Sequence, residues 1–538
     1  MNSKHTHRSR LPWQALALLA LAASCKKEPY EGKDPYAGAK EPVSIKIDKS
    51  QATPASGAAG SSVTIKGQGF FKYKDSGLAV MFNGVQGTIS SVTENALSVK
   101  VPDGASTGLI TLSVQRQVFP GPKFRVTGPV TIDQQFASVP GADKNSIASI
   151  SFVPGGKYLI SGNFEDYDNS GAKDGYRGLA RINSNGHIDR DFKIGKGFDG
   201  NVSGTIMQSD GKIIAVGNFS NYDGRYGGGL LSYIARLNDN GSMDSIRVTD
   251  VAGKNHAVPA LNAYFDGEIT HVLQTADSGK IIVFGKFKYF MRKNFAGISV
   301  DGKRDSTIID SVRMEGLARL NEDGTFDPNF HLNPATNTSF AGPNGEVKDV
   351  LLQDDGKIIM AGTFTRFRDQ LTGRIVRLNP DGTIDGNFNT GTGPDNTVES
   401  IAPINGGKLL AVGAFMSFNG KETRKVVMLQ ANGTPDPGFT VGTGVNAGPD
   451  GLVHFGGQLK NGKIFISGGF GRFSGVKRDG TVILDEDGKV SQGYNTMGSL
   501  SGRINRMLHV PNSSATVVVG NFSEYDLIPV SRIMLLRY

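Results

Sequence analysis

From about residue 128 to its end, the chain repeats one pattern, and this repeat restricts the possible folds more than any other feature. One half of the pattern reads "DGKIIAVGNF" at residues 210–219 and "DGKIIMAGTF" at residues 355–364. Its seven copies recur about every 52 residues, with longer second and third intervals, and they close on Phe164, Phe219, Phe287, Phe364, Phe415, Phe470 and Phe522. Such regular recurrence is typical of an array of supersecondary units.

The other half of the pattern predicts a second hairpin in each unit. It reads "ARLNEDGTFDPNF" at residues 318–330 and "VRLNPDGTIDGNF" at residues 376–388. Asp-Gly and Asn-Gly supply the positive φ angles that tight hairpin turns require. Each unit is therefore expected to form four antiparallel strands, and seven units predict a seven-bladed β-propeller over residues 128–538. A helical solenoid is excluded because the units contain no period of 3.6 residues.

The last copy is incomplete, because the chain stops at "SRIMLLRY", residues 531–538, before the expected turn. The missing part matches the start of the propeller, where "TIDQQF" at residues 131–136 resembles "TIDGNF" at residues 383–388. We expect this early segment to join the seventh blade as its outermost strand. The N-terminal and C-terminal strands of the propeller then close the ring and leave no open edge at the seam.

The N-terminal 24 residues read as a signal peptide, with a basic start and an apolar run too short to span a bilayer comfortably. The run ends in "LAASC", which resembles a bacterial lipobox and implies that Cys25 is lipidated and becomes the new N-terminus. An ordinary secretory signal is the alternative. Residues 25–41 then form a flexible polar tether, so that only the lipid is expected to touch the membrane.

Residues 42–127 alternate between apolar and polar positions in about seven short segments, which predicts a small β-sandwich. The stretches "GQGF" at 67–70, "VMFNG" at 80–84 and "VKVPDGASTG" at 99–108 resemble the IPT/TIG immunoglobulin-like domain. This resemblance implies a spacer role, with ligand binding as the alternative. The predicted fold class is therefore all-β, a sandwich followed by a propeller.

The repeats resemble the delta-60 family of propellers at their "GKII" and "RLNxDGT" stretches. A lipobox, an IPT/TIG domain and these repeats together are similar to the surface lipoproteins that accompany TonB-dependent glycan importers in Gram-negative bacteria. The resemblance implies a non-enzymatic protein, lipid-anchored in the outer membrane and facing the exterior, which captures polysaccharide for an importer and its associated lipoproteins. Two alternatives stay open: a structural subunit of the importer complex without a glycan site, and a propeller glycoside hydrolase.

Net charge and histidine spacing give no support for a protein that binds nucleic acid or a metal ion. The chain has 58 basic and 50 acidic residues, and three basic residues lie in the signal peptide, which leaves a net charge of only +5 and no reason to expect nucleic acid as a partner. The histidines lack metal-ligand spacing, and Cys25 is the only cysteine, so we expect neither metal nor cofactor. Asp349 and Glu399, on the first strands of adjacent blades, form the one carboxylate pair that a hydrolase could use.

An aromatic residue follows each closing phenylalanine by three positions, and its presence in every unit predicts packing between blades rather than a site. A ligand site should lie where the repeats differ, in loops that are inserted on one face. The aromatic residues there that no repeat position demands are candidates for stacking on sugar rings, with packing inside the loops as the alternative: Tyr176, Tyr226, Tyr233, Tyr289 and Phe295.

Cations in the same loops predict a basic rim suited to an acidic glycan, because arginine presents a planar fork to carboxylate or sulfate. The candidates are Arg292, Arg368, Arg424 and Arg478. A solvated surface is the alternative, since acidic residues lie between them. By contrast, Arg181, Arg236, Arg319 and Arg377 recur too regularly to mark a single site.

Overall fold

The computed structural model describes residues 43–171, 175–249, 253–276, 278–295, 307–443 and 447–538. All but the first two of these residues belong to one compact unit, Ile45–Tyr538. The signal peptide, Cys25 and the tether lie outside the described residues. Within the described part, helix is limited to α2 (Gln134–Ala137) and two 3-10 turns, Phe71–Tyr73 and Asn405–Gly407, and no helix is long and apolar enough to cross a bilayer.

The first part of the described chain is a sandwich of two sheets, as the alternating pattern predicts. One sheet has the order β1-β3-β7-β6 and the other β2-β9-β8-β4-β5. Apolar side chains of alternate positions, such as Val63 and Leu112, are fully buried between them, and the Phe82 and Phe124 rings meet edge to face at 5.3 Å. The strands are β1 (Lys46–Ile47), β2 (Ser56–Gly57), β3 (Ser62–Gln68), β4 (Ala79–Phe82), β5 (Val85–Gln86), β6 (Thr88–Val92), β7 (Ala96–Lys100), β8 (Gly108–Val114) and β9 (Gln117–Val126).

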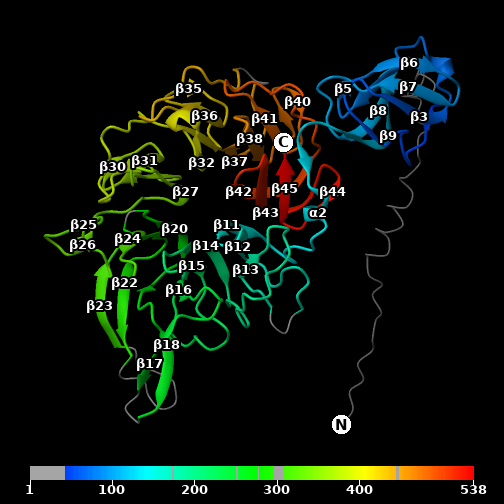
Figure 1. Ribbon diagram of the computed structural model, residues 1–538. Coiled ribbons are helices and arrows are strands. Elements are labelled where there is room, and N and C mark those ends of the chain that lie inside the picture. The colour runs from blue at the N-terminus through cyan, green and yellow to red at the C-terminus, as the bar shows by residue number, and fades with distance from the viewer. Residues whose placement is uncertain (1–42, 172–174, 250–252, 277, 296–306, 444–446) are drawn as a thin grey trace, which may run out of the picture. The chain divides into compact units, whose positions relative to one another are not determined.

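After the sandwich, the described residues form seven antiparallel sheets in chain order, which surround a common axis (Figure 1). The first strand of each sheet lies nearest the axis: β11 (Ile147–Val153), β14 (Asn201–Met207), β20 (Ile269–Gln274), β27 (Val347–Leu352), β32 (Val398–Ile404), β37 (Val453–Gln458) and β42 (Leu500–His509). The second strands carry the "GKII" copies: β12 (Lys157–Gly162), β15 (Ile213–Asn218), β21 (Ile281–Gly285), β28 (Ile358–Gly362), β33 (Lys408–Gly413), β38 (Ile464–Gly468) and β43 (Ala515–Tyr525). The third strands carry the "RLN" copies: β13 (Leu179–Ile182), β16 (Ile234–Leu237), β24 (Leu317–Leu320), β31 (Ile375–Leu378), β36 (Val426–Leu429), β41 (Thr481–Leu484) and β45 (Ile533–Arg537).

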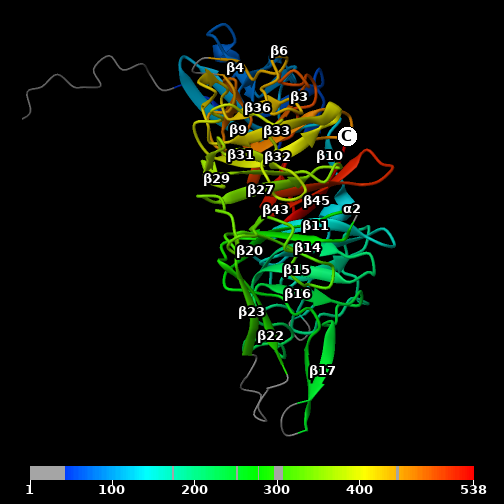
Figure 2. The same cartoon turned by 90° about the vertical axis from the view of Figure 1, so that its left-hand side faces the viewer.

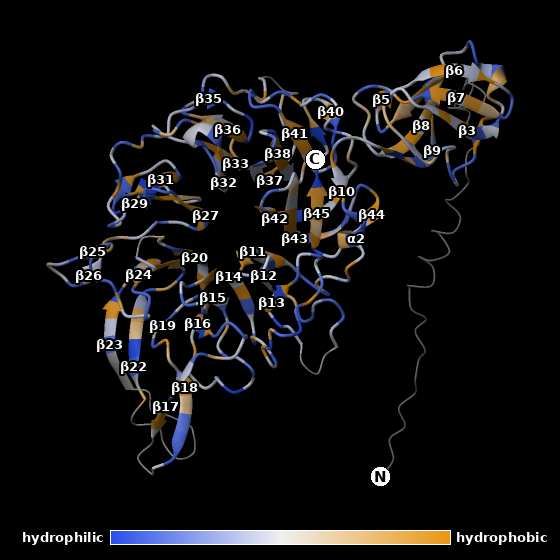
Figure 3. Cartoon of the chain, in the orientation of Figure 1, coloured by the Kyte–Doolittle hydropathy of each residue, from blue (hydrophilic) through white to orange (hydrophobic). Residues whose placement is uncertain are grey.

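Hydrophobic residues concentrate in these strands, and the loops between them are mostly hydrophilic (Figure 3). The second strands are apolar at consecutive positions, and in β28 every residue is buried. A strand that is buried on both faces reads in this way because each sheet is covered by its two neighbours. The core is therefore distributed between the sheets.

The last sheet confirms the predicted closure. Strand β10 (Thr131–Ile132) pairs with β45, and Ile132 lies opposite Leu536. The segment is shorter than expected as a strand, because the Asp133 side chain accepts a hydrogen bond from the Phe136 amide at 2.9 Å and begins the short helix α2. Phe136 is nevertheless buried, and its ring packs into the first sheet's core.

The expectation of four full strands in every blade was wrong for the other six sheets. The fourth segment contributes only an isolated bridge, such as Leu378 to Ile384 in the fourth sheet. In the fourth sheet the cause is the aspartate that follows, since the Asp385 carboxylate accepts a hydrogen bond from the Asn387 amide at 2.9 Å and turns the chain out of the ladder.

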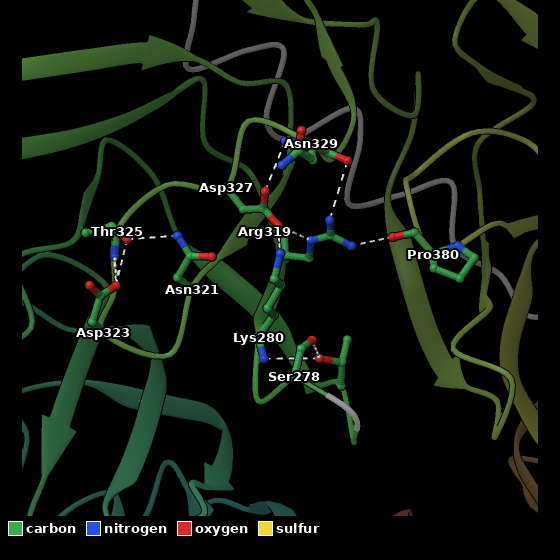
Figure 4. Close-up of polar contacts among 10 residues, drawn as sticks. Ser278, Lys280, Arg319, Asn321, Asp323, Thr325, Asp327, Asn329 and Pro380 are labelled. Carbon is green, nitrogen blue, oxygen red and sulfur yellow. Dashed lines mark hydrogen bonds and ion pairs between the residues drawn. The ribbon is translucent and has the colours of Figure 1, made fainter.

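The regularly repeated arginines are structural, as their regularity indicates. Arg319 Nε lies 2.7 Å from Asp327 Oδ2, and Lys280 Nζ lies 2.6 Å from the same oxygen (Figure 4). The Arg319 guanidinium also donates to the carbonyl of Pro380 in the next sheet and stacks on Phe330 at 4.7 Å. This cluster therefore joins adjacent sheets. Arg181 and Arg377 make the same aspartate and inter-sheet contacts.

In two of these clusters, those of Asp327 and Asp385, electrostatics favour the charged form of the aspartate. Burial raises the pKa of Asp327, but hydrogen bonds from Lys280 and the Asn329 amide, together with the Arg319 charge, outweigh it and hold the pKa below its ordinary value. The pKa of Asp385 is lowered in the same way by the Asn387 amide, Lys357 and Arg377. Each aspartate thus remains an anion that both cations can share.

The second aromatic column is buried, which confirms its predicted packing role. Its seven members are at most 2% exposed: Tyr167, Tyr222, Phe290, Phe367, Phe418, Phe473 and Tyr525. The Tyr167 hydroxyl donates to the Gly186 carbonyl at 2.8 Å, which satisfies its polar atom inside the core.

Insertions add hairpins outside the seven sheets. The largest, β17–β18 and β22–β23, extend in the same direction away from the ring in Figures 1 and 2. The added strands are β17 (Ser245–Thr249), β18 (Asn255–Pro259), β19 (Tyr264–Phe265), β22 (Tyr289–Asn294), β23 (Thr307–Arg313), β25 (Leu332–Asn333) and β26 (Thr338–Ser339). Short hairpins in the later sheets comprise β29 (Arg366–Phe367), β30 (Gln370–Leu371), β34 (Ser417–Phe418), β35 (Lys421–Glu422), β39 (Arg472–Phe473), β40 (Val476–Lys477) and β44 (Ile528–Pro529). The third and fourth sheets therefore depart most from the repeat.

Candidate functional site

Every first strand carries a β-bulge at the same place. The pairing between the first and second strands skips one residue in each sheet, for example between Val347 and Asp349 in β27. A bulge leaves its extra residue unpaired and re-aims its side chain. The seven bulge residues, one from each sheet, all line one cavity of about 250 Å³, which we call the axial mouth: Ala148, Ser203, Thr270, Lys348, Glu399, His454 and Asn505.

The residue after each bulge lines a second axial cavity of about 370 Å³, which we call the axial channel. This inner set comprises Ser149, Gly204, His271, Asp349, Ser400, Phe455 and Arg506. The mouth and the channel share lining residues such as Ser203 and Ser400, so the two cavities are continuous. The fold thus places two layers of non-repeating side chains around one axis.

The carboxylates of the axis are engaged by arginines of β42. Asp349, which is 4% exposed, lies 3.1 Å from Arg506 and also accepts hydrogen bonds of 3.0 Å from the Ser400 hydroxyl and the Ile401 amide. Glu399 lies 3.4 Å from Arg503. Both members of the carboxylate pair nominated from the sequence therefore have a cationic partner.

The two axial histidines carry no charge near neutral pH. Burial and, after it, the Arg506 charge lower the pKa of His271 to about 4, against the opposing effects of Asp349 and the Lys348 carbonyl. Burial, followed by the Arg503 charge, also lowers the pKa of His454. In the two layers the remaining charges are Lys348 and Arg506 against Glu399 and Asp349, and Arg503 adds one more cation to the mouth.

A third cavity, of about 820 Å³, lies between the third and fourth sheets, and we call it the groove. It shares Thr270, His271 and Lys348 with the axial mouth, so it leads outward from the axis. Its charged side chains are Glu268, Lys286, Lys288, Arg313, Glu315, Glu346 and Lys348. Several of them pair with one another, since Glu346 lies 2.6 Å from Lys348 and 3.3 Å from Lys286.

Tyr289 is the predicted aromatic residue that stands beside the groove. It is 40% exposed and lies directly opposite Arg313 in the β22–β23 ladder. Side chains of directly opposed residues share a face of the sheet, and Arg313 lines the groove. A hydrogen bond of 2.8 Å from the Tyr289 amide to Asp266 fixes its backbone.

The other predicted aromatic residues do not form a common platform. Tyr176 and Phe295 are 8% and 6% exposed, and their rings pack in hydrophobic clusters, so we remove them from the candidate site. Tyr226 and Tyr233 are half-buried and pack against the cores of the first and third sheets. Packing within the loops, the alternative considered from the sequence, describes these four residues better.

Most arginines of the expected basic rim are stacked, paired or buried within the fold. Arg368 stacks on Phe340 at 3.7 Å, Arg424 pairs with Glu422, and Arg478 is only 7% exposed. Burial lowers the pKa of Arg478, which reflects its desolvated position. Arg292 is half-buried on β22. These arginines therefore do not present a continuous cationic surface.

Sequence reasoning missed the bulge residues, although a signal exists. When the first strands are aligned, the bulge position holds a different residue type in all seven copies, whereas most neighbouring strand positions are aliphatic. Arg313 was also missed, because it belongs to an inserted strand with no counterpart elsewhere in the repeat. Lys286 was missed although it lies within a repeat copy, at a position where the other copies have asparagine, threonine, alanine or glycine. Among the described residues, no group of three or more histidine, cysteine, aspartate or glutamate side chains has a metal-binding arrangement.

Family models match two parts of the chain. The IPT/TIG domain model matches residues 49–132, and the model described as a domain of unknown function (DUF5122) beta-propeller matches residues 208–245, 299–330, 353–388 and 407–439. The chain carries an IPT/TIG domain and a DUF5122 β-propeller. This finding confirms the sandwich and the propeller that the sequence predicts.

No curated protein matches this chain. Solved structures with some likeness include a putative phosphatase from Bacteroides thetaiotaomicron, with 11% identity, 91% and 96% of the two chains covered and a TM-score of 0.33. An auxiliary nutrient binding protein from Bacteroides ovatus has 11% identity, 91% and 97% coverage and a TM-score of 0.32. The WD40 repeats of RRP9 have 9% identity, 76% and 98% coverage and a TM-score of 0.40. These scores are too low to carry an argument about function.

Proposed function

We propose that this chain is a non-enzymatic surface lipoprotein that binds a polysaccharide on the face containing the axial mouth and the groove, and passes it to a TonB-dependent importer. The observation that carries the proposal is the bulge layer. The same β-bulge in every sheet directs a different side chain into one cavity. The backbone therefore repeats at the axis, whereas the residue types there do not. Loops and inserted strands around such a position commonly form binding surfaces.

A binding role fits the chemistry of the axis better than hydrolysis. A glycosidase needs one carboxyl group that holds a proton and one that is free to act as base or nucleophile. Asp349 pairs with Arg506 and accepts hydrogen bonds from Ser400 and Ile401, and Glu399 faces Arg503, so neither carboxylate stands free to act as base or nucleophile. Hydroxyls and paired charges at the same place suit a ligand rich in hydroxyl groups, which can donate to carboxylates and accept from guanidinium groups.

Membrane attachment through Cys25 is part of the proposal. A variant with Cys25→Ser is expected to leave the membrane fraction and appear as soluble protein, because the acyl chains are its proposed anchor. The measurement is detergent phase partitioning of cells that express the wild-type chain or the variant. Equal partitioning of both proteins into the detergent phase would contradict lipidation at this cysteine.

Binding is tested by affinity electrophoresis of the protein without its signal peptide against dextran, amylopectin, xyloglucan, galactomannan, polygalacturonate and chondroitin sulfate. At least one polysaccharide is expected to retard the wild-type protein. Tyr289→Ala is expected to weaken the apparent affinity by about tenfold, because the variant loses the aromatic face on which a sugar ring is proposed to stack. Phe71→Ala is the matched control, since Phe71 is 50% exposed on the sandwich.

No retardation by any polysaccharide would overturn the glycan-binding proposal. The remaining candidate would then be a structural subunit of an importer complex. The observation that favours it is Ile246, an apolar side chain that is 51% exposed on the projecting β17–β18 hairpin. That role predicts co-purification of an importer with the propeller and no effect of Tyr289→Ala. Release of oligosaccharide products by the purified protein would instead favour a hydrolase.

A further inference from the structure

We propose that the axial mouth receives one end of a neutral saccharide chain and that the chain leaves along the groove between the third and fourth sheets. This inference rests on the proposed glycan-binding function and adds the class of glycan and its direction. The three cavities meet at Thr270 and His271, which line all of them, and the mouth and the groove also share Lys348.

The sizes of the cavities favour an end rather than a passing chain. The mouth, of about 250 Å³, is slightly below the usual range of ligand pockets, about 300–1,000 Å³, whereas the groove, of about 820 Å³, lies near its upper end. A small terminal cavity that joins a larger lateral one accepts a terminal ring and the units next to it. The groove gives the rest of the chain a route outward.

The first two sheets contribute the smallest side chains to the mouth and the channel. Their bulge and following residues are small: Ala148 and Ser149 in β11, and Ser203 and Gly204 in β14. The later sheets place long or charged side chains at the same positions, such as Lys348 and Arg506. A sugar ring can therefore sit against the small residues while its hydroxyls face the polar groups.

Charge pairing favours a neutral chain over a polyanion. Asp349 pairs with Arg506, Glu399 with Arg503, and Arg313 Nη2 lies 3.0 Å from Glu315. A carboxylate or sulfate on the ligand would have to displace these acidic partners and would meet their like charge at close range. Hydroxyl groups can instead bond to both members of each pair, because they donate and accept. This conclusion replaces the acidic glycan that the predicted basic rim suggested.

Competition with chains of different length tests the direction of binding. The probe is the neutral polysaccharide retained in electrophoresis, together with its oligosaccharides from partial acid hydrolysis. End capture predicts that, at equal mass concentration, fragments compete about tenfold better than the intact polymer, because hydrolysis multiplies the number of ends. Competition that weakens steadily as chains shorten would overturn end capture. Stronger retention by polygalacturonate or chondroitin sulfate than by every neutral polymer would overturn the neutral class.

Filling the mouth tests its location. Ala148→Trp is expected to reduce affinity for the retained polysaccharide by about tenfold or more, because the indole occupies the space of the terminal ring. Val118→Trp is the control, since Val118 is 65% exposed on the sandwich. Thermal unfolding of both variants checks their folding, and Ser203→Trp replaces Ala148→Trp if the latter fails to fold.

The outcomes separate the two proposals. Binding lost in Tyr289→Ala but retained in Ala148→Trp and Ser203→Trp would leave glycan binding standing and overturn the axial end site. Absence of binding by the wild-type protein would overturn both. Loss of binding in the mouth variants, with Val118→Trp unchanged, supports the end site.

Discussion

A chain that lacks residues 531–538 is expected to lose its folded propeller. The deletion removes β45, whose residues Ile533, Met534, Leu535 and Leu536 are all at most 8% exposed. Burial of each such side chain contributes about 1.5–3 kcal/mol. Their sum is comparable with the whole stability of an ordinary domain, about 5–15 kcal/mol. The loss also leaves β43 and β10 without their shared partner, so the ring opens between its first and last sheets.

The measurement is thermal unfolding followed by circular dichroism and limited proteolysis. Two point variants in the same strand grade the effect. Leu536→Ala is expected to cost about 2–5 kcal/mol, because it opens a cavity opposite Ile132. Arg537→Ala is expected to cost less than about 1 kcal/mol, since its ion pair with Asp133 is exposed. A shortened chain that melts like the intact protein would refute closure through β45.

Replacement of Asp327 by alanine is the second change with a large expected effect. The Asp327 side chain is 2% exposed and neutralises both Arg319 and Lys280. Its loss leaves Arg319 buried without an anion, which costs about 3–5 kcal/mol in the free energy of unfolding. The change also loosens the contact between Arg319 and the carbonyl of Pro380 in the next sheet.

The fifth sheet provides a matched control for this prediction. Among the described residues, its equivalent carboxylate, Asp436, forms an ion pair only with Lys408, because Met428 stands where the first four sheets have arginine. Lys408 is 44% exposed, so Asp436→Ala is expected to cost about 1 kcal/mol or less. Urea unfolding of both variants gives the comparison. Equal losses of stability in Asp327→Ala and Asp436→Ala would show that the arginine does not set the strength of the cluster.

The scaffold was largely predictable from the sequence because the sequence pattern of each of its elements occurs in many copies. The "GKII" strands, the Asp-Gly turns and the arginine column recur, so an error in one copy is corrected by the others. The split last sheet was predictable for the same reason, since residues 131–136 repeat a segment found at residues 383–388. Repetition failed only for the fourth strand, where Asp385 and its equivalents form side-chain turns that compete with a ladder.

The candidate site was predictable only in part, because each of its residues occurs in a single copy of the repeat or in an insertion. Tyr289 was found as an aromatic residue outside the repeat, but nothing in the sequence separates it from Tyr176, which the fold buries. Arg368 looked available until Phe340, from an insertion, covered its guanidinium. The bulge residues require the pairing register of two strands, and a strand pattern alone does not reveal which residue the register skips.

Under the proposed function, the bulges separate the residues that stabilise the sheets from those that contact the ligand. Each bulge residue is excluded from the strand pairing, and most of its neighbours in the strand are paired and packed. A substitution at Ala148 therefore changes the lining of the mouth at little expense to the sheets, whereas Asn505 also donates a hydrogen bond of 2.8 Å to the Ile147 carbonyl in the first sheet. A mutation at such a position alters one of the seven bulge side chains that line the mouth. Under the proposed function, a new ligand preference can therefore arise at positions such as Ala148 without redesigning the ring.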